Sequence, residues 1–393
     1  MSKTMSKTKE GNVPTWDVRF DMKVDVNHTK IVRCIAQAES LASVIRNVPI
    51  PPRSKKRIDA LNIMRAVRGT TGIEGTELTE DEVQKIMEAN PDQRVLPTTR
   101  AREEQEARNA QKVMLHMISR LNNEPTIPIT EELICEIHRI VTGNIDYPNN
   151  VPGKYRNHAV SAGSYIPPRA GQEVKRLMKE FIKWFNEDEP ANWHPVLKAV
   201  VAHFYIVSIH PFGDGNGRTA RVVESFLLYQ AGINARGFYS LANHYYQNRD
   251  KYMSLLDEVR FRTNNNLTPF LLFSLCGLVE ELQTVHKEVM DVVQQISFKD
   301  YARESLQGQR ATKSGERIWS LFFGLGDETI SLRELRSGKH KLSKPYHKLN
   351  PKTLSRDLQF LQEVKLIIID GDKLRANVEI MKEYTPPYEF FNQ

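Results

Sequence analysis

The sequence predicts a mainly helical protein with a smaller C-terminal domain that mixes helices and strands. Apolar residues recur at helical spacing in most segments up to about residue 296, which is the pattern of amphipathic helices. From residue 315 on, helical patterns are followed by two extended runs, 366–369 and 373–375, on either side of Asp370-Gly371-Asp372. An Asp-Gly pair between two extended runs is typical of a β-hairpin. The predicted fold class is therefore mainly α, with an α+β domain at the C-terminal end.

The composition indicates an ordinary globular protein without a disulfide framework. A length of 393 residues favours two or three domains. The 40% of apolar and 26% of charged residues exclude a collagen-like or largely disordered chain, and the net charge of +7 is compatible with phosphate-bearing partners. The three cysteines form no CxxC pair, which argues against a structural zinc site and fits a reducing compartment. Because the sequence shows neither an apolar signal-peptide core nor a run long enough to span a bilayer, we expect a cytoplasmic protein with no membrane partner.

Helical patterns fill the first part of the chain. Helices are predicted over 29–48, over 57–68, from residue 79 onward and over 99–121. The first is stopped by the prolines within 49–52, and the second ends in a loop at the glycine-containing residues 69–72. Thr79 and Glu82 have the spacing of a capping box, so the third helix is predicted to begin there.

The middle of the chain combines further helices with one extended segment. Helices are predicted over 130–142, 172–186, 195–209, 217–231 and 268–296. Residues 151–171 hold two glycine turns and a Pro-Pro pair around short extended pieces, which predicts a β-hairpin or flap on the surface. The chain is therefore divided into an N-terminal helical region (1–125, with a disordered tail over 1–12), a core (126–297), a polar linker (298–314) and a last domain (315–393).

The sharpest chemical signal is the stretch HPFGDGNGRTAR at residues 210–221, which lies between two helical patterns. Gly215 and Gly217 lack Cβ atoms, so backbone N–H groups can approach a phosphate there. The helix that follows presents the positive end of its dipole to the same place. Arg218 and Arg221 share one face of that helix, and arginine binds phosphate oxygens bidentately. The stretch therefore predicts an anion site at the start of a helix.

Two further residues of this stretch supply groups for chemistry on a phosphate. Asp214 offers a hard oxygen ligand suited to Mg²⁺, which usually arrives with the phosphates of its substrate. His210 ends the preceding helix, where it can take a proton from an attacking hydroxyl. A lone capping histidine or turn glycine has an ordinary structural explanation, so it is the combination that indicates a site. The sequence has no Walker A pattern, which excludes a P-loop ATPase.

These residues resemble the signature of the Fic family, HPFxDGNGRxxR, at every specified position. The resemblance implies a Fic-type helical core that transfers AMP from ATP to a hydroxyl side chain of a target protein. It implies that His210 is the general base, that Asp214 binds Mg²⁺ and that Arg221 holds the γ-phosphate. The other phosphate-binding residues would be Gly215, Asn216, Gly217 and Arg218. The phosphotransferase branch of the family has lysine where this chain has Gly217, so the glycine favours nucleotidyl transfer.

A second motif precedes the first by well over a hundred residues. Thr70, Glu74 and Gly75 occupy the fixed positions of [S/T]xxxE[G/N], which resembles the inhibitory motif of self-inhibited Fic proteins whose inhibitory helix is N-terminal to the core. The resemblance implies that Glu74 pairs with Arg221 and so keeps the γ-phosphate from binding there. The alternative is a solvated glutamate at the end of a helix, because so short a pattern occurs in many loops.

The resemblance extends over roughly residues 60–290 and implies two further contacts. Residues 151–171 would be the flap whose extended edge pairs with the backbone of the target protein. Its docking residues would be Val160, Tyr165 and Ile166. Arg249 and Tyr252 would lie near the adenine pocket. Val259 stands where some relatives have asparagine, so the adenine contacts stay open.

The last domain has the element order of a winged helix and most of the chain's net charge. Residues 331–375 contain 11 Lys and Arg against 5 Asp and Glu, which is compatible with contacts to DNA phosphates. The candidate contacts are Lys352, Arg356, Lys373 and Arg375. The alternative is a protein-interaction or dimerisation module, because the sequence shows no pattern that reads bases.

Three functions remain open at this point. The first is a self-inhibited protein adenylyltransferase, which every residue of the motif favours. The second is an enzyme that also or instead removes AMP, with Glu74 aligning a water molecule. The third is a DNA-binding regulator whose Fic core senses ATP. The partners expected for the first are ATP and a target protein with a Ser, Thr or Tyr hydroxyl, with self-modification and a homodimer as further possibilities.

Overall fold

The computed structural model describes residues 16–163, 165–234, 241–308 and 311–384. The tail predicted over 1–12 lies outside the described residues. The chain forms two compact units, residues 1–287 and 288–393. Most described elements are helices, and the strands form a single small antiparallel sheet, so the mainly helical fold class is confirmed. No helix within the described ranges is long and apolar enough to cross a bilayer.

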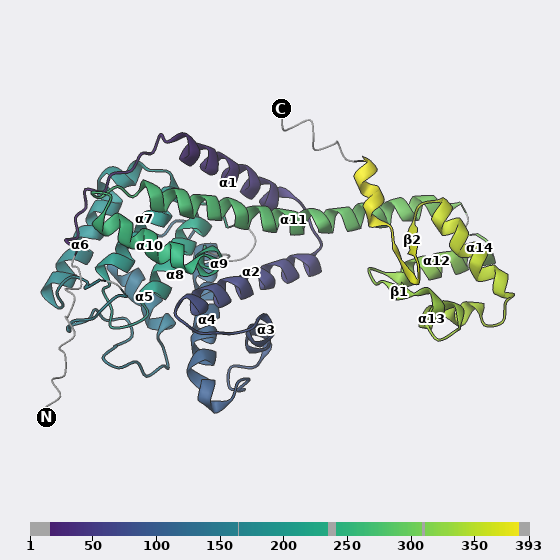
Figure 1. The fold of residues 1–393 in the computed structure, drawn as a ribbon, viewed down its shortest axis with the longest axis horizontal. Coiled ribbons are helices and arrows are strands. Elements are labelled where there is room, and N and C mark those ends of the chain that lie inside the picture. Colours follow the sequence, from purple (N-terminus) through teal and green to yellow (C-terminus); the bar gives the residue numbers. More distant parts are fainter. Residues whose placement is uncertain (1–15, 164, 235–240, 309–310, 385–393) are drawn as a thin grey trace, which may run out of the picture. The chain divides into compact units, whose positions relative to one another are not determined.

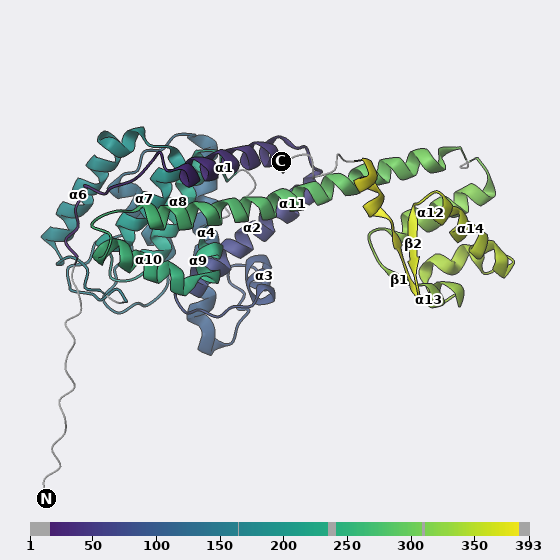
Figure 2. The same ribbon diagram turned by 45° about the horizontal axis from the view of Figure 1, so that its top comes forward.

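The first unit is built around the helix pair α7 and α8 (Figures 1 and 2). Its helices are α1 (Thr29–Asn47), α2 (Pro52–Ile73), α3 (Glu80–Glu88), α4 (Ala101–Asn123), α5 (Glu131–Val141), α6 (Gln172–Glu187), α7 (Pro195–Ile209), α8 (Asn216–Gln230), α9 (Ala242–Gln247), α10 (Arg249–Phe261) and the beginning of α11 (Thr268–Gln307), with short 3₁₀ turns at Thr98–Arg100 and Glu189–Asn192. Helix α7 is apolar all round and almost wholly buried, as expected of a central helix. The loop between α7 and α8 is therefore held at both ends by the core.

Helix α2 is longer than the sequence predicts, because residues 69–72 continue the helix up to Ile73. The two glycines serve close packing against α9 rather than a turn. A Cβ at Gly69 would lie 2.7 Å from the carbonyl of Ala242, and one at Gly72 would lie 2.4 Å from the ring of Tyr246. The prediction of a loop at 69–72 was therefore wrong. The capping box is confirmed, since the hydroxyl of Thr79 and the carboxylate of Glu82 bond reciprocally at the start of α3.

The segment 151–171 is held by side chains instead of a strand ladder. Its described residues form one isolated bridge, between Ala162 and Tyr165, so the predicted β-hairpin is reduced to a tight turn. Arg156 replaces the ladder by donating to the carbonyls of His158 at 3.1 Å and Pro168 at 2.6 Å. A third bond, to the carbonyl of His210 at 2.7 Å, ties the segment to the end of α7.

The predicted polar linker over 298–314 is in large part helical, because α11 continues to Gln307. Phe298, Ala302 and Leu306 recur every four residues and are buried in the core of the second unit. This narrow apolar stripe is easily missed in a polar segment, yet it is enough to bury one face of a helix. The boundary between the compact units falls accordingly at residues 287 and 288 instead of after 297.

The second unit adds α12 (Lys313–Leu325), β1 (Ile330–Ser331), α13 (Leu332–Arg336), a 3₁₀ turn (Lys341–Tyr346), α14 (Pro351–Glu363), β2 (Ile367–Asp370), β3 (Lys373–Ala376) and a final 3₁₀ turn (Val378–Tyr384). The sheet order is β1-β3-β2 with antiparallel pairing. Asp370 pairs with Lys373 across the two-residue turn of the predicted hairpin. The interpretation of this order of helices and strands as a winged helix stays a prediction.

Candidate active site

The loop between α7 and α8 has a fixed shape that its own residues determine. His210 ends α7 with φ 52°, and Gly215 begins α8 with φ 74°, both in the left-handed region. The side chain of Asn216 closes the loop, because its amide oxygen accepts from the N–H of Phe212 at 2.8 Å and its NH₂ donates to the same residue's carbonyl at 3.0 Å. Phe212 is buried and stacks on His138 at 3.7 Å between ring centroids. Asn216 thus shapes the loop with its side chain, and its backbone N–H lies at the start of α8, where a phosphate could bind.

His210 is arranged as a neutral base. Its Nδ1 lies 3.2 Å from the carbonyl of Val207, and a carbonyl can only accept, so Nδ1 carries the proton and Nε2 keeps its lone pair. Burial lowers the pKa of His210 to about 4, although the bond to Val207 favours the charged form. The imidazole is therefore unprotonated near neutral pH.

Arg218 lies at the centre of a buried network. Its Nη2 donates to Asp214 Oδ1 at 2.9 Å, and its Nη1 donates to the Tyr147 hydroxyl at 2.5 Å. Nη1 also lies 3.2 Å from Glu106 Oε1. The carboxylate of Glu106 accepts in addition from Tyr147 at 2.7 Å and from Thr76 at 2.9 Å. The guanidinium is thereby fixed in orientation beside Asp214.

Arg221 is paired with the motif at the end of α2. It is 2% exposed, and its Nη2 donates to Glu74 Oε1 at 2.6 Å. Thr70 accepts from the same guanidinium twice, with its hydroxyl at 2.9 Å and its carbonyl at 3.0 Å. The structure thus joins the two motifs through one guanidinium, and it uses two of the three residues predicted to form the second motif.

Glu74 is held in this position by its surroundings. Gly75 follows it with φ 95°, a conformation that a side chain would strain, and its N–H bonds to the carbonyl of Gly72 at 3.0 Å. Burial alone would raise the pKa of Glu74, but the charges of Arg221 and Arg218 outweigh it and keep the pKa below its ordinary value. A Cβ at residue 217 would lie 2.5 Å from Glu74 Oε1, so any larger residue there would displace the carboxylate from its present position.

Two cavities of about 260 Å³ each meet at Glu74, which lines both. The first, the base cavity, is lined by Ile73, Glu74, Ala162, Gly163, Tyr165, Val207, His210, Gly217, Arg221, Arg249, Tyr252, Met253, Leu256 and Arg260. The second, the acid cavity, is lined by Glu74, Gly75, Thr76, Arg102, Glu103, Glu106, Asp214 and Arg218. The base and the Arg221 guanidinium thus open into one space, while Asp214 and Arg218 open into the other.

The residues predicted for docking and for adenine are only partly where the sequence places them. The side chain of Tyr165 is buried, and its hydroxyl donates to the carbonyl of Ser208. It therefore anchors the segment and cannot dock a target, which corrects the prediction. Ile166 is 41% exposed and Val160 is half-buried, so both keep an accessible side. Tyr252 does line the base cavity, and its hydroxyl bonds to His203 Nε2 at 2.9 Å.

The residues behind Arg218 were not predicted from the sequence. Glu106 and Arg102 are on α4, and Tyr147 follows α5. The only signal of Glu106 in the sequence is a carboxylate next to Ala107 on the apolar side of a predicted helix, where a buried charge requires a partner. The identity of that partner could not be inferred without the packing of α4 against α8.

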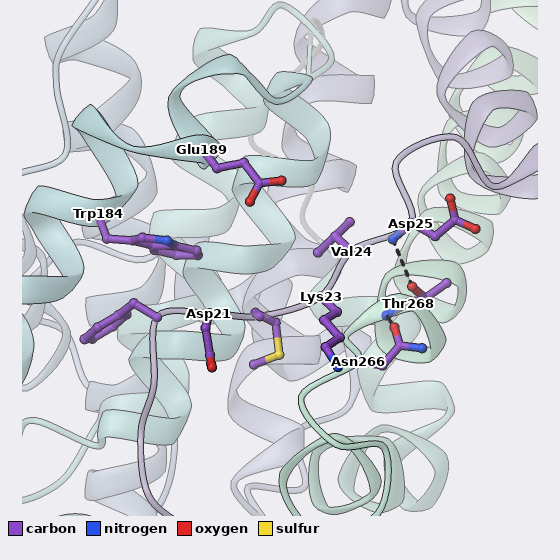
Figure 3. A pocket seen from close by; sticks show the side chains of 10 residues that line it. Asp21, Lys23, Val24, Asp25, Trp184, Glu189, Asn266 and Thr268 are labelled. Atoms are coloured by element: carbon purple, nitrogen blue, oxygen red, sulfur yellow. Dashed lines mark hydrogen bonds between the residues drawn. The ribbon is translucent and has the colours of Figure 1, made fainter.

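A larger cavity than either the base cavity or the acid cavity lies elsewhere in the first unit. It measures about 590 Å³ and is formed where the segment before α1 passes α6 and the start of α11 (Figure 3). Asp25 donates its N–H to the hydroxyl of Thr268 at 3.2 Å at one end of it. No residue of 210–221 lines this cavity, so cavity size does not mark the chemical site.

Comparison with known proteins places the site within a family. The sequence pattern of the Fic/DOC family matches residues 128–228. The protein adenylyltransferase Fic of Drosophila melanogaster is 34% identical over 184 residues, which are 47% of this chain and 35% of that protein. The corresponding protein of Drosophila erecta is 28% identical over 290 residues, or 74% of this chain and 54% of that protein. The chain thus spans about a third to a half of the curated relatives it matches.

Solved structures show the same fold at low sequence identity. A Fic family protein from Desulfovibrio desulfuricans G20 superposes with a TM-score of 0.53 over 89% of this chain and 96% of that chain, at 19% identity. Fic-1 (residues 134–508) from C. elegans superposes with a TM-score of 0.53 over 66% of this chain and 72% of that chain, at 22% identity. The family pattern thus identifies residues 128–228 as a domain of the Fic/DOC family, and the solved structures show that the chain shares the Fic fold.

Proposed function

We propose that the chain is a protein adenylyltransferase that moves AMP from ATP to a hydroxyl group of a target protein, and that Glu74 inhibits it. The observation that carries the proposal is the base cavity, into which a neutral His210 and the Arg221 guanidinium both open. A base without an anion site would suit many reactions. A base beside a glycine-rich helix start and two arginines suits group transfer from a polyphosphate. The names of the curated relatives support the same activity.

Each residue of the loop has a distinct role in the proposed reaction. The hydroxyl oxygen of the target forms a bond to the α-phosphorus while His210 Nε2 takes its proton. The bond between the α-phosphorus and the bridging oxygen to the β-phosphate breaks, and its electron pair leaves with pyrophosphate. Arg218, Arg221 and the first N–H groups of α8 neutralise the phosphate oxygens, because these N–H groups have no partner within the helix. The hydroxyl, the α-phosphate and the base must all meet in the base cavity.

Asp214 fits a magnesium ion. Its side chain is 38% exposed and lines the acid cavity, and Arg218 and the N–H of Gly215 bond to only one of its two oxygens. Mg²⁺ commonly binds one or two carboxylates and takes its other ligands from phosphates and water, so a single carboxylate is sufficient. When bound, the ion would supply positive charge to the phosphate oxygens. Asp214 would hold it, and Arg218 orients Asp214.

The target protein would meet the site along the segment 151–171. Ile166 is exposed there, and Ala162 and Gly163 line the base cavity beside it. A peptide laid along this edge would bring a Ser, Thr or Tyr hydroxyl towards His210. Hydroxyls of the chain itself or of a second copy are further acceptors, so self-modification and a homodimer belong to the proposal.

Two positions of the label in ATP test the reaction. The Glu74→Gly variant is incubated with Mg²⁺, a lysate and ATP labelled on either the α- or the γ-phosphate. AMP transfer places label on protein from α-labelled ATP only. Label from γ-labelled ATP would indicate phosphate transfer, and no label from either would overturn the proposed activity.

Removal of AMP is a second candidate, because Glu74 lies where it could act on a water molecule. Its carboxylate lines the base cavity together with His210, and a carboxylate held there in its charged form can orient an attacking water. A target that already carries labelled AMP distinguishes the two. Loss of label with the unaltered protein, and not with Glu74→Gly, would support removal.

Replacing Asp214 with alanine is expected to lower Mg²⁺-dependent transfer by about 100-fold or more, comparable to removing one charge-stabilising group from an active site. Arg218→Ala is expected to weaken ATP binding, since its guanidinium lines the same cavity. ATP binding by calorimetry, with Mg²⁺ and with a chelator, provides a readout besides activity. Asp81→Ala is the matched control, because Asp81 is an exposed carboxylate whose partner is Lys85 on the same helix. Full activity of Asp214→Ala with Mg²⁺ would remove this residue from the metal site.

DNA is a further proposed partner, of the second unit. Lys352, Arg356 and Lys373 are exposed, and in the described part of the chain no ion pair occupies them. Arg375 is half-buried and paired with Glu379 at 3.2 Å, so it is a weaker candidate than the sequence implied. The free basic side chains lie on α14 and in the hairpin, the elements with which winged helices contact duplexes.

A DNA contact would show in the salt dependence of binding. We expect the full chain to bind a labelled duplex in fluorescence anisotropy, with an affinity that falls steeply between 50 and 200 mM salt, as phosphate contacts require. Lys352→Ala and Arg356→Ala are each expected to reduce the slope of log K against log salt by about one. Lys365→Ala is the control, because Lys365 is exposed but paired with Glu383. Binding that none of these substitutions changes would favour a protein-interaction module instead.

A further inference from the structure

The acid cavity contains a guanidinium to which the proposed reaction has assigned no part. Arg102 belongs to the first turn of α4, outside the residues that match the family pattern. Its side chain is 56% exposed and lines the cavity together with Asp214 and Arg218. A half-exposed cationic side chain in a cavity, beside a candidate metal ligand, is suited to binding an anion.

The Arg102 guanidinium is held by protein contacts at Nε and on its face, while its two amino groups have no protein hydrogen-bond acceptor among the described residues. Its Nε donates to Glu106 Oε1 at 3.1 Å, and its guanidinium carbon lies 4.4 Å from the centre of the Tyr147 ring. Its Nη2 lies 3.9 Å from Asp214 Oδ2, which is beyond hydrogen-bond distance. Among the described residues no other group accepts a hydrogen bond from it, so both amino groups keep their N–H donors for a ligand.

The other charges around the acid cavity are already committed. Both amino groups of Arg218 donate to protein partners, to Tyr147 and to Asp214. The carboxylate of Glu103 pairs with Arg100 at 2.7 Å, outside the cavity lining, and the carboxylates of Glu74 and Glu106 are bound by arginines. Arg102 is therefore the cation of this cavity whose hydrogen-bonding capacity is least used by the protein itself.

We propose that Arg102 binds the diphosphate end of the nucleotide, that is the β- and γ-phosphates, and the pyrophosphate that leaves. The inference rests on the proposed function. In that reaction negative charge accumulates on the leaving pyrophosphate, and His210 lies in the other cavity, so the end of the nucleotide farthest from the base extends past Glu74 towards Asp214. The planar fork of arginine matches two oxygens of one phosphate group. Stacking on Tyr147 and the hydrogen bond to Glu106 fix the orientation of the Arg102 guanidinium before the ligand binds, which reduces the conformational entropy lost on binding.

Pyrophosphate and AMP are the probes that separate this role from a structural one. Both are titrated calorimetrically, in the presence of Mg²⁺, into Glu74→Gly and into Glu74→Gly with Arg102→Ala. We expect the second variant to bind pyrophosphate about 10-fold more weakly, at the lower end of the contribution of a hydrogen bond to a charged group. Binding of AMP, which lacks the diphosphate, is expected to change less than twofold. Arg176→Ala in the same background is the matched control, because Arg176 is 52% exposed and pairs with carboxylates on its own helix.

Arg102→Lys keeps the charge without the planar fork and covers the case in which the alanine variant is unstable. An intermediate loss of pyrophosphate affinity with lysine supports the proposal. Equal pyrophosphate affinity with and without Arg102 overturns it, as does an equal loss for AMP. If Glu74→Gly itself binds neither ATP nor pyrophosphate, the proposed function fails first and the inference fails with it.

Discussion

Replacing His210 with alanine is expected to lower AMP transfer by about 10²- to 10⁴-fold, the usual contribution of a general base. ATP binding is expected to stay nearly intact, because the base acts on the hydroxyl of the target and not on the nucleotide. Transfer is measured with α-labelled ATP and binding by calorimetry. His210→Asn is the better-matched variant, since His210 has φ 52° and asparagine tolerates this conformation more readily than alanine does. Unchanged transfer by both variants would exclude His210 as the base.

The pH dependence of the same reaction follows from the burial of His210. With a pKa of about 4, the imidazole stays unprotonated until the pH falls far below the ordinary histidine value of about 6.5. We expect the acid limb of kcat/KM to lie well below pH 6, and a midpoint near 6.5 would contradict the assignment. Between about pH 6.5 and 4, His210 binds a proton in the unfolded chain but not in the folded one. The free energy of unfolding is therefore expected to decrease as the pH falls from about 6.5 towards 4. Buried His138, whose pKa burial also lowers to about 4, adds to this decrease.

Replacing Glu74 with glycine is expected to raise transfer by about 10- to 100-fold, the range that corresponds to one hydrogen bond between charged groups. Arg221→Ala breaks the same ion pair but is expected to abolish activation. In the proposed mechanism, Glu74 only blocks the Arg221 guanidinium, whereas the nucleotide requires that guanidinium for binding. The double variant is expected to resemble Arg221→Ala alone, a non-additivity that is typical of residues in direct contact. Self-labelling with α-labelled ATP compares the four proteins.

The control for this series is Glu124→Gly, which also removes a glutamate from the C-terminal end of a helix, α4. It is expected to label like the unaltered protein. Equal labelling of Glu74→Gly and the unaltered protein would mean that Glu74 does not inhibit, and its contact with Arg221 would then be a structural ion pair. Activation by Arg221→Ala would show that binding of the γ-phosphate does not require Arg221.

The parts of the site that are contiguous in sequence could be predicted, and the parts that packing assembles could not. His210, Asp214 and Arg218 are separated by a few residues of one loop and the helix start that follows it, so their spacing already predicts their proximity. The contact between Glu74 and Arg221 was accessible only through resemblance to a family motif. Glu106 and Tyr147 carry no local signal, because their roles depend on how α4 and the segment after α5 pack against α8.

The wrong predictions share a physical origin, which is that the same local pattern can have different roles in different tertiary surroundings. The glycines at 69 and 72 predict a loop, yet they allow two helices to pack closely. Tyr165 was placed on a docking edge, but its ring fills the core under that edge. Residues 298–307 look like a linker by composition, although three apolar side chains bury one helix face. In each case tertiary contacts override a local pattern.

The close packing of α9 against the glycines of α2 couples the positions of the two helices. The backbone of Ala242 and the ring of Tyr246 lie directly against glycines of α2, so the two helices are in close contact. A displacement of α9 is therefore passed on to the end of α2, a single turn before Glu74. Asn243 of the same helix donates to Glu281 of α11 at 2.7 Å, which connects this contact to a third helix. In the proposed mechanism, the release of Arg221 from Glu74 would therefore depend on the positions of α9 and α11 as well as on the nucleotide, so that a force applied far from the chemistry could alter activity.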